Sequence, residues 1–179
     1  MLRMYSIMWG MKIERIWAMP NKWTFTIKPI KELLAEEVKK GEWWADPFCG
    51  LHSPANQTND LNPGVLAHYH FDALSYLRGM LTACADGILF DPPYSITQAA
   101  QCYRDYGTEK LKTSVANMAY WKQVKDEISR VLKPGGKVIC FGWTSMGLGK
   151  GRGFEMQRIL LVPHGGSKND TIVTVETKL

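Results

Sequence analysis

Residues 86–94 read DGILFDPPY, an apolar run that stops at an acidic residue followed by two prolines. The run from Asp86 to Phe90 has the length and composition of a buried strand, and proline is a poor strand residue because it has no backbone N–H. Asp91-Pro-Pro-Tyr94 should therefore lie at the carboxyl end of that strand. Open α/β sheets bind their ligands at this edge, so the tetrapeptide is the first candidate for a functional site.

Helical and strand-like segments alternate along the rest of the chain. Apolar residues at helical spacing predict helices over 30–40, from the cap residue Asp72 to Leu81, and over 116–132. Strands are expected at 42–45, 66–71, 86–90, 137–143, 155–162 and 171–177, and residues 12–28 look extended around Trp23–Ile27. This alternation predicts an α/β sheet. The last two strands are joined too briefly for a parallel crossover, so they should form an antiparallel hairpin.

Composition narrows the class of protein without fixing its function. The 179 residues are 45% apolar and 22% charged, as in globular proteins, and the net charge of +5 suits a polyanionic partner but also many enzymes. The four cysteines form no C-x-x-C pair, and no His/Cys cluster has zinc spacing, so we expect free thiols and no metal. The apolar start of the chain is too short to span a membrane, which predicts a cytoplasmic protein with no membrane partner.

The residues of Asp91-Pro-Pro-Tyr94 suit one kind of chemistry. The exocyclic amine of adenine or cytosine is a weak nucleophile because its lone pair is delocalised into the ring. The Asp91 carboxylate and the Pro92 carbonyl could accept hydrogen bonds from that amine, and Pro92 and Pro93 would hold the carbonyl rigid. Tyr94 offers a face for stacking an extruded base, worth about 1–3 kcal/mol. The alternative is a rigid turn, with Asp91 as a turn residue and Tyr94 in the core.

Three further stretches accompany this motif. They are Trp23-Thr-Phe-Thr-Ile-Lys-Pro-Ile30, Asp46-Pro-Phe-Cys-Gly50 and Val131-Leu-Lys-Pro-Gly-Gly136. Together with Asp91-Pro-Pro-Tyr94, they make residues 20–145 resemble the S-adenosylmethionine-dependent amino-methyltransferases of DNA, the N6-adenine and N4-cytosine enzymes. The resemblance implies a Rossmann-like class I methyltransferase fold, a mostly parallel sheet with the C-terminal hairpin, in a single domain over residues 1–179. It also implies DNA as partner and S-adenosylmethionine as cofactor.

The resemblance assigns roles to individual residues. Asp91, Pro92, Pro93 and Tyr94 would be catalytic, and the adenine enzymes favour Asp or Asn where the cytosine enzymes more often have Ser. The implied cofactor-binding residues are Thr26, Ile27, Lys28, Pro29, Asp46, Pro47, Phe48, Gly50, Asp60, Leu61, Asp72 and Ala73. Asp60 would bind the ribose hydroxyls and Asp72 the adenine amine of the cofactor. The alternatives are an Asx turn for Asp60 and a helix cap for Asp72.

The sequence departs from the family pattern after Gly50. The family has a helix before the ribose-binding acid, but here Asp60 follows only ten residues later. A parallel crossover needs about a dozen residues or more, so this helix should be missing or reduced to a turn. The strands carrying Trp43-Trp44 and Ile88–Phe90 would then lose cover. A homodimer or the folded-back segment 1–20 could replace it.

No separate target-recognition domain is expected. Base-contacting residues should come from the segment 95–115, which includes Tyr103, Arg104, Tyr106, Lys110 and Lys112, and phosphate contacts from Lys150, Arg152 and Arg158, or these basic residues are ordinary surface. The sequence therefore predicts methyl transfer to N6 of adenine in DNA. An RNA amino-methyltransferase and a nucleic-acid-binding module with a decayed cofactor site remain the alternatives.

Overall fold

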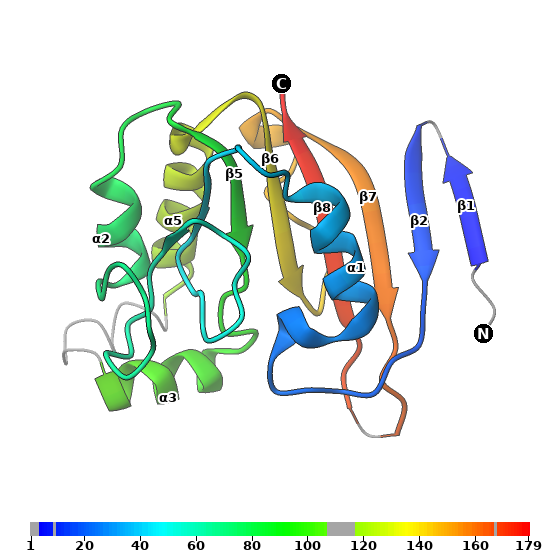
Figure 1. Ribbon diagram of the computed structural model, residues 1–179, viewed down its shortest axis with the longest axis horizontal. Coiled ribbons are helices and arrows are strands. Elements are labelled where there is room, and N and C mark those ends of the chain that lie inside the picture. Colours follow the sequence, from blue (N-terminus) through cyan, green and yellow to red (C-terminus); the bar gives the residue numbers. More distant parts are fainter. Residues whose placement is uncertain (1–3, 9, 107–116, 167) are drawn as a thin grey trace.

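The computed structural model describes residues 4–8, 10–106, 117–166 and 168–179, and within them the chain forms one sheet flanked by helices (Figure 1). The strands are β1 Met4–Met8, β2 Met11–Arg15, β3 Trp44–Asp46, β4 Gln57–Thr58, β5 Ala85–Phe90, β6 Leu132–Gly142, β7 Phe154–Val162 and β8 Thr171–Lys178. The helices are α1 Lys28–Glu37, α2 Ala73–Arg78, α3 Ile96–Tyr106 and α5 Met118–Val131, with short 3-10 turns at Thr24–Thr26 and Lys150–Arg152.

The strands are arranged in the order β1-β2-β7-β8-β6-β5-β3-β4. Among the described residues, four strand pairs are parallel and three are antiparallel, which confirms the mostly parallel sheet. β8 lies between β6 and β7 and is antiparallel to both, which confirms the predicted C-terminal hairpin. Because β3, β5, β6 and β7 share one direction, the residues that follow them gather at one edge of the sheet.

Helices cover the two faces of the sheet separately. α1 has Pro29 in its first turn, where a missing N–H costs nothing, and places Ile30, Leu33 and Leu34 on one face at helical spacing. In Figure 1 this helix crosses the front of β6 and β8. The core on the opposite face contains α2 and α5, which pack against strand residues such as Ile88 of β5 and Val138 of β6. Because successive side chains of a strand point to opposite faces of the sheet, alternate residues belong to two separate cores.

The helix predicted to be missing after Gly50 is absent from the described residues 47–56, as expected. The expected loss of cover does not follow. Trp44 is 1% exposed and Leu89 is 0% exposed because α1 and Ala55 pack over this face of the sheet, and Ile88 is 0% exposed in the core on the opposite face. The homodimer stays a prediction, now without the exposed strands that suggested it.

Three sequence predictions are wrong, in whole or in part, in this region or beside it. Residues 4–15 do not fold back over the sheet, since β1 and β2 extend its edge beyond β7 (Figure 1). The expected strand at 66–71 is reduced to a single bridge between Asn59 and Tyr69. Trp23 and Ile27 are extended as predicted, but Thr24–Thr26 between them forms a 3-10 turn in which the Thr26 hydroxyl donates to the Trp23 carbonyl at 2.8 Å. The short polar hydroxyl competes for backbone groups that a strand would need.

Candidate active site

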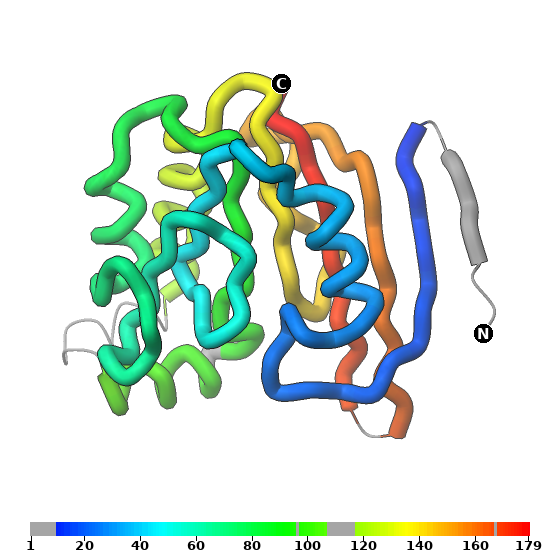
Figure 2. The backbone as a smooth tube through the Cα atoms, in the orientation of Figure 1, coloured from blue at the N-terminus to red at the C-terminus, as the bar shows by residue number. Residues whose placement is uncertain are grey.

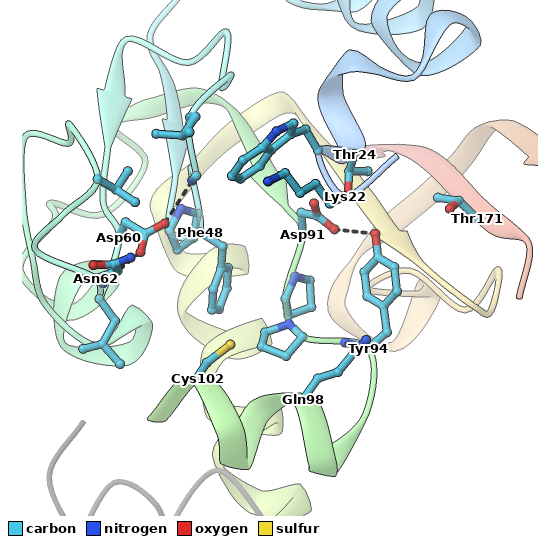
Figure 3. Close-up of a pocket in the computed structure, with 18 of the residues that line it drawn as sticks. Lys22, Thr24, Phe48, Asp60, Asn62, Asp91, Tyr94, Gln98, Cys102 and Thr171 are labelled. Carbon is cyan, nitrogen blue, oxygen red and sulfur yellow. Dashed lines mark hydrogen bonds between the residues drawn. The ribbon is translucent and has the colours of Figure 1, made fainter. Parts of the chain in front are cut away.

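A cavity of about 890 Å³ lies where β3 and β5 end (Figure 3). All four residues of Asp91-Pro-Pro-Tyr94 line it, as do Pro47, Phe48 and Gly50 of the stretch after β3. The opposite wall comes from the segment before α1 and from the turn between β7 and β8. Segments far apart in the sequence therefore meet here because they all follow, or lead into, strand ends at one edge of the sheet.

Asp91 holds a carboxylate in this cavity under unusual conditions. The Tyr94 hydroxyl donates to Asp91 Oδ1 at 2.5 Å, as Figure 3 shows, and Thr24 also hydrogen-bonds the carboxylate. Burial raises the pKa of Asp91 to about 6, although the hydrogen bonds from Tyr94 and Thr24 lower it. The carboxylate is thus ionised at neutral pH and fixed in position, which suits a group that accepts hydrogen bonds from a substrate.

Tyr94 is fixed on three sides. Its backbone N–H donates to Gln98 Oε1 at 2.9 Å, and its ring meets the Trp143 ring edge-on, with 5.8 Å between centroids. Burial and the neighbouring Asp91 carboxylate raise the pKa of Tyr94, so the hydroxyl stays protonated and donates. The predicted alternative, in which Tyr94 belongs only to the core, does not describe this side chain, since it also lines the cavity.

Asp46 lies under the cavity wall and does not line the cavity. It is fully buried, and its two carboxylate oxygens accept from Phe48 N at 2.9 Å and from Ser53 Oγ at 2.6 Å. Burial raises the pKa of Asp46 to about 7, with smaller increases from the charges of Asp91 and Asp60. Asp46 therefore shapes the turn that carries Phe48 and Gly50 to the cavity.

Asp60 and Leu61 line the same cavity two or three residues after β4. The Asp60 carboxylate accepts from Gly50 N at 3.0 Å and from Asn62 N at 2.9 Å. The second bond is the predicted Asx turn, and the first ties Asp60 to the turn after β3. An ionised carboxylate has about four acceptor positions, so two remain for other donors.

Asp72 and Ala73 differ in their position relative to the cavity. Ala73 lines the cavity, whereas Asp72 does not. Asp72 caps α2 by accepting from Ser75 N at 3.1 Å, and it also accepts from the Tyr120 hydroxyl at 3.3 Å. The cap that the sequence offered as the alternative is therefore present, and a contact to a cofactor amine stays a prediction.

Comparisons with known proteins rest on structure alone. No known family profile and no curated sequence matches the chain. TrmN from Thermus thermophilus matches with a TM-score of 0.54 at 18% identity, over 86% of this chain and 49% of that one, so this chain spans about half of its length. An S-adenosylmethionine-dependent methyltransferase from Methanosarcina mazei matches with a TM-score of 0.55 at 13% identity, over 82% and 97%.

A third match is the 1,6-didemethyltoxoflavin-N1-methyltransferase of Burkholderia thailandensis, a structure with S-adenosylhomocysteine bound. Its TM-score is 0.58 at 12% identity, over 84% of this chain and 77% of that one. The chain has the fold of S-adenosylmethionine-dependent methyltransferases. This confirms the predicted fold class.

The methyltransferase fold places the segment before α1 at the cavity differently from the prediction. Of the four residues expected there, Ile27 lines the cavity, while Thr26, Lys28 and Pro29 do not. Lys22, Trp23 and Thr24 line it instead. The 3-10 turn explains the shift, because it turns the residues at its start toward Asp91 and leaves Lys28 and Pro29 to begin α1.

Several lining residues were missed by sequence reasoning. Trp143 follows β6, and His164 and Thr171 flank the turn of the C-terminal hairpin, where His164 Nε2 and Thr171 Oγ1 are 2.9 Å apart. No motif marks these positions. Their one signal is that each lies next to a predicted strand end.

The segment expected to supply base contacts contains the helix α3, Ile96–Tyr106, which the sequence analysis did not predict. Its buried residues Ala99 and Tyr103 are separated by polar residues, so its helical period is weak. Tyr103 and Tyr106 line the cavity, whereas Lys110 and Lys112 lie outside the described residues.

The expected phosphate contacts of the C-terminal basic residues do not fit the structure. Arg158 is 8% exposed and paired with Glu14 at 2.5 Å and Glu36 at 2.6 Å. Arg152 pairs with Asp126 at 2.8 Å. Arg152 and Lys150 precede the start of β7, whereas the cavity lies beyond its end.

The described residues offer neither a metal site nor a membrane-spanning helix. Within them, no group of three or more His, Cys, Asp or Glu side chains could hold a metal ion. No helix in the same residues is long and apolar enough to cross a membrane.

Proposed function

We propose that this chain transfers a methyl group from S-adenosylmethionine to the exocyclic amine of a base in nucleic acid, with N6 of adenine in DNA as the target. The observation that carries the proposal is the Asp91 carboxylate, half-buried and fixed by the Tyr94 hydroxyl at 2.5 Å inside a cavity at the strand ends. A carboxylate in this place accepts a hydrogen bond from the amine. That bond localises the nitrogen lone pair and makes the nitrogen a better nucleophile.

The residues of the cavity fit the cofactor chemically. When bound, S-adenosylmethionine supplies an electrophilic methyl group on a positively charged sulfonium. The carboxylate of Asp60 lines the cavity and favours a cation over a neutral molecule. Phe48, Leu61 and Ala73 provide the apolar wall that a purine ring requires, and Asp60 retains acceptor positions for hydroxyl groups.

The aromatic side chains at the mouth of the cavity support a base as the acceptor. Tyr94 and Trp143 meet edge-on, so one ring face of each is free of the other. A flipped base needs an aromatic or apolar surface to replace the stacking it loses. A cavity of about 890 Å³ lies at the upper end of the usual range for ligand sites, as a pocket for both a cofactor and a base would.

The test is methyl transfer to defined nucleic acids. Duplex DNA, single-stranded DNA, RNA and free adenosine are incubated with cofactor carrying a labelled methyl group, and the digested products are identified by mass spectrometry. We expect N6-methyladenine from DNA as the main product. N4-methylcytosine would contradict the adenine assignment, and label in RNA alone would contradict DNA as the substrate.

The pKa of Asp91 predicts how transfer depends on pH. The carboxyl group accepts from the amine only when ionised, and its pKa lies at about 6. Because this value is raised, transfer is fully present well above pH 6 and is lost as the pH falls through it. At about pH 5 we expect roughly a tenth of the plateau value of kcat/KM. A profile that is flat between about pH 5 and 8 would contradict this role.

A further inference from the structure

A second cavity, of about 670 Å³, opens beside α1 on the side of the missing helix. α1 and the segment before it form one wall, and residues 52–56 form the other, drawn in cyan next to α1 in Figure 2. Trp44 lies in its floor.

The charge of this groove is strongly one-sided. Lys31, Lys39 and Lys40 line it and are exposed, against one lining carboxylate, that of Glu42. Glu42 Oε2 already accepts from Trp44 Nε1 at 2.8 Å and from the Lys39 backbone N–H at 3.4 Å. We call the three exposed residues Lys31, Lys39 and Lys40 the lysine groove.

Two of the three acidic residues of α1 pair with basic residues outside the lysine groove. Glu36 pairs with Arg158 at 2.6 Å, and Glu37 pairs with Lys137 at 2.7 Å. In the ranges that the structure describes, no ion pair involves a lysine of the groove. The three positive charges therefore face solvent together, which is the arrangement that attracts a polyanion.

The lysine groove adjoins the catalytic cavity. His52 lines the groove and Trp23 lines the cavity, and their rings meet edge-on with 5.7 Å between centroids. The Lys22 ammonium lies 4.7 Å from the centre of the Trp23 ring, and Figure 3 shows Lys22 within the cavity. Basic side chains and aromatic rings thus lie beside one another where the groove and the cavity adjoin, and both kinds of group bind single strands.

We infer that the lysine groove binds phosphates of a nucleic-acid strand on one side of the base that occupies the catalytic cavity. The inference deepens the proposed function and rests on it, because it assumes a nucleic-acid substrate. It also gives this chain a means of holding a strand through residues within the methyltransferase fold. Such contacts fix the position of the strand and read no sequence.

The experiment measures binding without methyl transfer. Fluorescence anisotropy of a labelled oligothymidylate, which contains no adenine, is followed over a range of salt concentrations. For the triple variant Lys31→Ala, Lys39→Ala and Lys40→Ala we expect affinity about 100-fold weaker in about 0.1 M salt. The slope of log affinity against log salt should fall by about two, as expected for three lost phosphate contacts to a single strand.

A second triple variant removes the same charge elsewhere. Arg15, Lys122 and Lys150 are exposed and lie on β2, α5 and the turn before β7, so Arg15→Ala, Lys122→Ala and Lys150→Ala should retain most of the affinity. Replacing the groove lysines by arginine should restore binding. Equal loss in both alanine triples, or no binding by the original chain, would overturn the inference. Groove-dependent binding without methyl transfer to any nucleic acid would overturn the proposed function alone.

Discussion

Asp91→Ala should abolish methyl transfer while leaving the affinity for S-adenosylmethionine nearly unchanged. In the proposed reaction the carboxylate accepts a hydrogen bond from the amine, and removing one such preorganised group costs on the order of 10³-fold in kcat. The cofactor retains Asp60, Leu61 and the apolar wall, which the substitution does not touch. Single-turnover transfer measures the first quantity, and isothermal titration with the cofactor measures the second.

Two matched variants show whether the loss belongs to the acceptor. Asp91→Asn keeps a carbonyl oxygen at the same place and should retain more transfer than alanine, with the pH dependence below pH 7 removed. Asp126→Ala removes a half-exposed carboxylate of α5 that does not line the cavity. This variant should transfer methyl groups at the normal rate. Near-normal turnover by Asp91→Ala would contradict the assignment of the tetrapeptide to the active site.

The part of the candidate site around Asp91 was predictable because its position depends on local sequence. An apolar run before two prolines fixes where β5 ends, and the strand end fixes where Asp91 lies. Pro92 and Pro93 cannot continue the sheet, so the chain must turn at this point. The same logic located Phe48 and Gly50 after β3.

The rest of the cavity depends on contacts between distant segments, which periodicity does not reveal. Trp23 and Thr24 reach the cavity only because a 3-10 turn precedes α1, and an apolar, β-branched stretch looks like a strand. Trp143 and His164 reach it because β6 and β7 run parallel to β5. The order of the strands brings these residues together, and that order cannot be read from the local patterns of a single sequence.

The loss of cover was mispredicted for a similar reason. The short link between Gly50 and Asp60 correctly indicated that a helix is missing. It gave no information about where α1 would pack, and α1 buries the same strands from an earlier part of the chain. A missing element predicts exposure only when its neighbours are also known.

Trp44→Ala should be among the most destabilising substitutions in the chain. Trp44 is 1% exposed, and its ring lies directly over Gly87, where an added Cβ would stand 2.3 Å from a ring carbon. This contact joins β3 to β5, the two strands whose ends carry Asp46 and Asp91. Truncating a buried tryptophan leaves a large void, and we expect the free energy of unfolding to fall by about 3–5 kcal/mol.

Trp143→Ala is the control because it removes a side chain of the same size and chemistry from a partly exposed position. Trp143 is 40% exposed at the cavity, so its loss should change the free energy of unfolding by about 1 kcal/mol or less. Urea unfolding followed by circular dichroism measures the free energy of unfolding of both variants, and in thermal unfolding the midpoint temperature of Trp44→Ala should drop by roughly 10 °C. If both tryptophans cost the same, the packing of Trp44 on Gly87 would not be what holds β3 against β5, and another contact would have to align the two acidic strand ends.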